Sequence, residues 1–116
     1  MITASRWNAR SAALLITAAL FACSAGSGKT ANTNVKTVLI DHFKYQPDTL
    51  AANVGDTIEW KNVDIVPHTV TAADRKSFDS GHIANGAYWR FTFSKRGTYD
   101  YFCTLHPNMA AKVIVQ

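Results

Sequence analysis

The chain has 116 residues, a formal net charge of +4 and two cysteines, and 17% of its residues are charged. This length corresponds to about one domain, which excludes a large multidomain enzyme. Hydrophobic residues make up 47% of the chain and aromatic residues 11%, so the composition is not that of a disordered protein. Two cysteines form at most one disulfide, which excludes a disulfide-rich scaffold.

Residues 1–22 have the pattern of a secretory signal peptide. Two arginines and no acidic residue precede a short apolar run at residues 12–22. This run is too short to span a bilayer, which needs about 20 apolar residues. The run ends in the sequence LFAC, which resembles a bacterial lipoprotein box, and this interpretation predicts a lipid on Cys23. The alternative is ordinary signal cleavage near Ala22 or Ala25.

Residues 23–34 are predicted to form a flexible tether in front of a single domain at residues 35–116. The stretch SAGSGKTANTN contains no large apolar residue. A chain of this composition has an average end-to-end distance of about 18 Å. Such a tether suits a domain held near a membrane, and we expect contact with the membrane only through the lipid on Cys23.

The positive charge belongs partly to the export signal. Loss of Arg6 and Arg10 with the signal leaves ten basic and eight acidic residues, a net charge of +2. The sequence has no run of more than two lysines or arginines. A nucleic-acid partner is therefore not expected.

Residues 35–116 show the alternation of β-strands and no convincing helical period. Trp89, Phe91 and Phe93 alternate with other residues, and Ile58 and Trp60 do the same. Short β-rich runs occupy residues 35–40, 98–103 and 112–115. Turn residues separate such runs at Gln46-Pro47-Asp48, Gly55-Asp56, Asn85-Gly86 and Arg96-Gly97. The pattern predicts an all-β sandwich.

One group of residues suggests metal chemistry. Cys103, His106 and Met109 lie three residues apart in a short loop between two predicted strands, and His68 supplies a second imidazole from far upstream. Each alone is more often a packing or surface residue. Two imidazoles, a thiol and a weak axial thioether together form the ligand set of a blue copper centre. Sulfur ligands favour Cu(I) and imidazoles suit Cu(II), so the set serves both oxidation states.

The segment from Val35 to Gln116 resembles a cupredoxin, and most of all the amicyanin and plastocyanin-like group. The matching pieces are Phe43-Lys44-Tyr45-Gln46-Pro47, GDTIEWKN at residues 55–62, Pro67-His68-Thr69-Val70, GTYDYFC at residues 97–103, and His106-Pro107-x-Met109. The resemblance implies a Greek-key β-sandwich and one type 1 copper ion that cycles between Cu(I) and Cu(II). It also implies that the copper ligands are His68, Cys103, His106 and Met109.

Thr69 departs from the pattern of the family. Many relatives have asparagine directly after the first ligand histidine, where the amide ties the two ligand loops together. Thr69 occupies this position here. Its hydroxyl is expected to reach the backbone near Thr104, although with a shorter side chain.

The signal peptide implies an exported, periplasmic or extracytoplasmic protein, and the copper site and the resemblance imply that it shuttles single electrons between redox partners. We expect these partners to dock near His106 and Pro107, where the ring edge of the histidine should reach the surface, and we expect a monomer. One alternative is a periplasmic copper-binding carrier or sensor without a role in electron transfer. Another is a sandwich that binds a partner without metal.

The neighbours of Cys103 argue against enzymatic chemistry. Phe102 and Thr104 stand where a multicopper oxidase has histidines that lead to further copper ions. A binuclear electron-transfer site needs two cysteines in the loop, and a closed zinc site would not use methionine. Five other polar residues are expected to lie in solvent or outside any ligand cluster: His42, His82, Asp64, Asp74 and Asp79.

Overall fold

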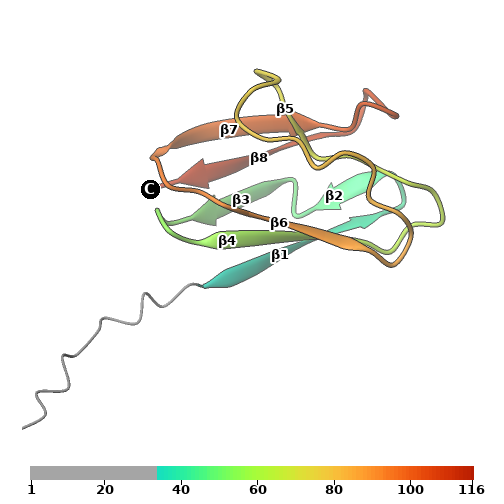
Figure 1. Ribbon diagram of the computed structural model, residues 1–116, viewed down its shortest axis with the longest axis horizontal. Coiled ribbons are helices and arrows are strands. Elements are labelled where there is room, and N and C mark those ends of the chain that lie inside the picture. Colours follow the sequence, from blue (N-terminus) through green and yellow to red (C-terminus); the bar gives the residue numbers. More distant parts are fainter. Residues whose placement is uncertain (1–33) are drawn as a thin grey trace, which may run out of the picture.

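The computed structural model describes residues 34–116. This part of the chain folds into two four-stranded sheets and the segments that connect their strands (Figure 1). The first sheet has the order β2-β1-β4-β6, with strands β2 (Lys44–Gln46), β1 (Val35–Asp41), β4 (Thr57–Asn62) and β6 (Tyr88–Thr92). The second has the order β3-β8-β7-β5, with strands β3 (Thr49–Ala52), β8 (Ala110–Val115), β7 (Gly97–Phe102) and β5 (Thr71–Ala72). The predicted all-β sandwich is confirmed.

Both sheets are mixed. β1 pairs in parallel with β4, and β3 pairs in parallel with β8, whereas the other neighbours are antiparallel. The chain crosses between the sheets at the predicted turn, where only Pro47 and Asp48 separate β2 from β3. Strands that are not consecutive in the sequence are neighbours in both sheets, as the predicted Greek-key connections require.

No helix able to cross a membrane was found in the described part of the chain. The predicted signal peptide and nearly all of the predicted tether, including Cys23, lie outside the described residues.

The apolar side chains that alternate with other residues in the sequence form much of the core. Ile58 and Trp60 of β4 are completely buried between the sheets. Trp89, Phe91 and Phe93 point to the same face, with neighbouring ring centroids 5.7 and 5.0 Å apart. The side chains at alternate positions of these strands therefore fill the space between the sheets, as the period of two predicts.

Phe78 adds a core side chain from outside the strands. It lies in the connection between β5 and β6, yet only 5% of it is exposed. Its ring centroid lies 5.2 to 6.4 Å from six aromatic rings of the core: Trp60, Trp89, Phe91, Phe93, Tyr99 and Tyr101. The connection is thereby fixed onto the sandwich.

Four segments gather at one end of the sandwich. The β1–β2 turn, the β4–β5 connection and the β7–β8 loop all lie at this end, and so does part of the connection that leads to β6 (Figure 1). The beginning of β1 and the end of β8 lie at the opposite end. Residues far apart in the sequence can therefore meet where the segments converge.

Candidate metal centre

The β7–β8 loop brings three of the predicted site residues together. Cys103 directly follows β7, and β8 begins directly after Met109. The amide of Met109 donates to the carbonyl of His106 at 2.8 Å, and the amide of Cys103 donates to the carbonyl of Met109 at 3.1 Å. These two bonds close the loop, so its backbone curls around one point.

His68 reaches the same point from the β4–β5 connection. It exchanges two backbone hydrogen bonds with Ile83, at 3.2 and 2.7 Å, which form an isolated β-bridge. The side chain of His68 is completely buried. The bridge holds its backbone in place although no long strand runs there.

The two imidazoles face the thiol of Cys103. The distance from Sγ to Nδ1 is 3.8 Å for His68 and 3.6 Å for His106. The donor atoms of the three residues all lie within 4.8 Å of one another. Cys103 is completely buried and His106 is half-buried. Two nitrogen atoms and one sulfur atom therefore converge beneath the surface.

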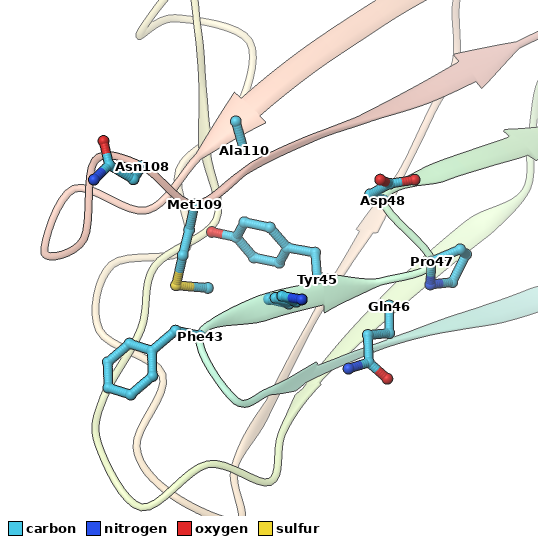
Figure 2. A pocket seen from close by; sticks show the side chains of 9 residues that line it. Phe43, Tyr45, Gln46, Pro47, Asp48, Asn108, Met109 and Ala110 are labelled. Carbon is cyan, nitrogen blue, oxygen red and sulfur yellow. The ribbon is translucent and has the colours of Figure 1, made fainter.

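Met109 is buried beside this cluster, with 5% of it exposed. Figure 2 shows its side chain directed from the end of the ligand loop toward the hairpin that carries Phe43 and Tyr45. A cavity of about 430 Å³, which Met109 and Tyr45 help to line, separates this loop from the β1–β2 hairpin. The thioether is thus buried on the side of the loop that faces this hairpin.

Asp64 belongs to the site, contrary to its expected place outside any cluster. Its Oδ2 atom lies 3.0 Å from Nε2 of His68. An ionised carboxylate only accepts hydrogen bonds, so Nε2 of His68 is the donor, and in the neutral ring Nδ1 then has its lone pair toward the sulfur. No sequence signal distinguishes this contact, because a spacing of four residues predicts a meeting of side chains only on a helix, and this connection is not helical.

The turn before β2 completes the surroundings of Asp64. The amide of Phe43 donates to Oδ2 of Asp64 at 3.0 Å. This bond, followed by the bond from His68, lowers the pKa of Asp64 below its usual value. The carboxylate is therefore ionised at neutral pH and links the β1–β2 turn to the imidazole.

Asn62 is a second residue that the sequence analysis missed. Its side chain is completely buried at the end of β4. Its amide nitrogen donates to the carbonyls of Val66 at 2.8 Å and Ile83 at 2.9 Å, and its oxygen accepts from the amide of Asp64 at 2.9 Å. One buried side chain thus shapes the turn that presents Asp64.

Phe43 covers both imidazoles. His42 and Phe43 form the β1–β2 turn with positive φ angles of 49° and 57°, an uncommon conformation for residues other than glycine. The ring of Phe43 meets His68 and His106 edge to face, at centroid distances of 5.5 and 4.9 Å. The turn therefore places an aromatic ring over the cluster.

Thr69 joins the two ligand segments, as expected. Its amide donates to Sγ of Cys103 at 3.3 Å. Its hydroxyl accepts a hydrogen bond from the amide of Thr104 at 2.8 Å. The shorter hydroxyl thus makes the tie to the Thr104 backbone that the sequence predicts.

Tyr45 holds the backbone of Thr69 through a hydrogen bond. The hydroxyl of Tyr45 donates to the carbonyl of Thr69. Burial raises the pKa of Tyr45, and the nearby Cys103 raises it further. Tyr45 therefore stays protonated and keeps its role as a donor.

Apolar side chains surround the exposed edge of His106. Phe43 is 49% exposed and Leu105 is 40% exposed. Pro107 and Asn108 are exposed beside them and, with Phe43, His106 and Met109, line a shallow cavity of about 320 Å³. His42 and His82 are exposed, as expected. The imidazole of His106 is therefore the part of the cluster that meets the surface.

The donor set fits a type 1 copper ion. A thiolate and a thioether are soft ligands, imidazole nitrogens suit both oxidation states of copper, and the trigonal His-Cys-His arrangement is diagnostic. The donor atoms face one another, and the remaining nitrogen of His68 is bonded to Asp64. This second bond is the usual way in which a protein orients a histidine that binds metal.

Comparison with known sequences agrees with the geometry. A family model described as a cupredoxin-like domain matches residues 12–115. Amicyanin from Paracoccus denitrificans is 36% identical over 87 residues, which cover 66% of this chain and 62% of that protein. Amicyanin-alpha from Methylorubrum extorquens is 30% identical over 109 residues, which cover 90% of this chain and 92% of that protein. The match thus spans about three fifths of the length of the Paracoccus amicyanins.

Solved structures of cupredoxins are also similar to this chain. A purple cupredoxin from Nitrosopumilus maritimus superposes with a TM-score of 0.66 and 28% identity, over 69% of this chain and 98% of that one. A Cu(I) form of an amicyanin variant superposes with a TM-score of 0.66 and 34% identity, over 71% of this chain and 82% of that one. The chain therefore belongs to the cupredoxin family, whose cofactor is one type 1 copper ion.

Proposed function

We propose that this protein is an exported electron carrier that holds copper through His68, Cys103, His106 and Met109. The observation that carries the proposal is the convergence of the first three residues, whose donor atoms lie within 4.8 Å of one another. The bound ion would supply a one-electron couple between Cu(II) and Cu(I). The likeness to amicyanins supports this role over that of an enzyme.

Hydrogen bonds from the surrounding residues would hold the donors in place. Asp64 fixes the ring of His68, and the amide of Thr69 donates to the sulfur of Cys103. Because these bonds leave little freedom to the side chains, one arrangement of donors serves both oxidation states. Binding requires the thiolate of Cys103, so affinity for the metal falls at low pH.

Partners dock, in this proposal, on the apolar surface around His106. Phe43, Leu105 and Pro107 surround the half-buried imidazole and offer a contact without charged side chains. Small interfaces suit redox partners that meet briefly and separate. The edge of His106 is then the route by which an electron enters or leaves, and the protein works as a monomer.

Addition of Cu(II) to the metal-free protein should give an intense visible absorption and a reversible one-electron wave in voltammetry. Cys103→Ser should lose both, because the absorption needs the thiolate. Cys23→Ser is the matched control and should keep both. A colourless copper complex would contradict the proposal, and transfer of copper to a metal-free acceptor without electron cycling would favour a copper carrier.

Asp64→Asn should raise the reduction potential of the copper protein. The asparagine oxygen still accepts the bond from His68, but the negative charge that favours Cu(II) is gone. We expect a rise on the order of 60 mV, which corresponds to a tenfold change in the equilibrium constant of a one-electron couple. Asp100→Asn removes the same charge from an exposed position on β7 and should leave the potential almost unchanged. Equal shifts in the two variants would show that Asp64 has no special effect.

Leu105→Glu should slow electron self-exchange at low ionic strength, measured by NMR line broadening in mixtures of the oxidised and reduced protein. When two copies meet through this surface, the new carboxylate of each copy lies near that of the other, and the repulsion slows their association. Val54→Glu is the matched control, because Val54 is 46% exposed and its amide bonds to the carbonyl of Gln116 at the other end of the sandwich. A similar loss in both variants would argue against docking near His106.

We further propose that the protein is anchored outside the cytoplasm through a lipid on Cys23, after removal of residues 1–22. Mass spectrometry of the protein purified from membranes should show an acylated cysteine at the mature N-terminus. Cys23→Ala should yield an unmodified or uncleaved chain. An unmodified N-terminus that begins after Ala22 or Ala25 in the unchanged protein would rule out the anchor.

A further inference from the structure

A chain of hydroxyl groups runs from the surface to the ligand loop. The hydroxyl of Thr71 lies 3.1 Å from Oδ1 of Asp79. The hydroxyls of Thr69 and Thr71 are 3.1 Å apart, and those of Thr69 and Thr104 are 3.2 Å apart. We propose that Asp79 is a positioning residue, which orients this chain and thereby holds the loop that begins at Cys103.

The carboxylate determines the direction of every bond in the chain. An ionised carboxylate only accepts hydrogen bonds, and a hydroxyl has one proton to donate. The hydroxyl of Thr71 donates its one hydrogen bond to Asp79, so it must accept a hydrogen bond from the hydroxyl of Thr69. Thr69 has then used its own hydrogen, so the hydroxyl of Thr104 must donate to it.

This direction satisfies the oxygen of Thr69 completely. Its two lone pairs accept from the amide of Thr104, at 2.8 Å, and from the hydroxyl of the same residue. In the opposite direction, Thr69 would donate to the hydroxyl of Thr104 and would accept only from the amide of that residue. Asp79 therefore selects the arrangement in which Thr69 accepts twice from the residue next to Cys103.

Burial makes this arrangement hard to replace. Thr69 and Thr71 are 2% and 3% exposed, so their hydroxyls depend on one another for hydrogen bonds. Asp79 is exposed, but the amide of Gly81 donates to its Oδ1 at 3.0 Å, and its backbone forms a bridge with Thr71. The acceptor at the outer end of the chain is thus itself held in place.

The amide of Thr104 in the metal-free protein gives a direct test by NMR hydrogen exchange. Asp79→Ala and Thr71→Val remove links of the chain and should speed its exchange about tenfold, the upper end of what one hydrogen bond contributes. Asp79→Asn and Thr71→Ser keep an acceptor and a hydroxyl and should resemble the unchanged protein. Asp100→Ala, which removes an exposed carboxylate elsewhere, should have no effect.

The amide of Val113 in β8 serves as the internal reference for global unfolding. Exchange at Thr104 that is unchanged in Asp79→Ala, or that rises in parallel with exchange at Val113, would overturn the proposal. In the copper-loaded protein, the two disruptive variants should also release copper faster to a chelator. This second result rests on the proposed function, whereas the first does not, so the two can fail separately.

Discussion

Three possible metal-binding atoms, one sulfur and two ring nitrogens, meet at one end of the sandwich, and the structure has to hold them there. Polar groups without partners are costly to bury, so their neighbours must supply hydrogen bonds in defined directions. Asp64 accepts from the outer nitrogen of His68, and the amide of Thr69 donates to the sulfur of Cys103. The turn at Asn62, the turn at Phe43 and the loop after β7 are all shaped by this requirement. The two sheets supply the fixed ends from which these segments extend.

The parts that local pattern reveals were predictable from the sequence. Strands such as β4 and β6 carry alternating side chains because one face of each packs against the other sheet. Cys103, His106 and Met109 stand within seven residues, so their spacing alone suggests a common loop. His68 is distant in the sequence, and its inclusion depended on the chemistry of the donor set and on the family resemblance.

The remaining parts depend on contacts that no local pattern records. Phe78 lies in a polar stretch, yet the space between the sheets admits its ring. Strand β5 has two residues, too few to show a period. Asp64 was passed over because a carboxylate that orients a ligand leaves the same trace in the sequence as one in solvent. Thr69 and Thr104 meet across 35 positions, and their contact was expected only because the family resemblance joins the two ligand loops at this place.

The placement of the ligand loops opposite the start of β1 has a mechanical consequence (Figure 1). A rigid body that is held at one end pivots about that end, and its far end sweeps the widest arc. With the proposed anchor at Cys23, the pivot would lie on the side of Val35 and the arc would be traced by His106. One anchored copy could then reach a donor and an acceptor at separate positions on the same membrane by rotation alone, without leaving its point of attachment.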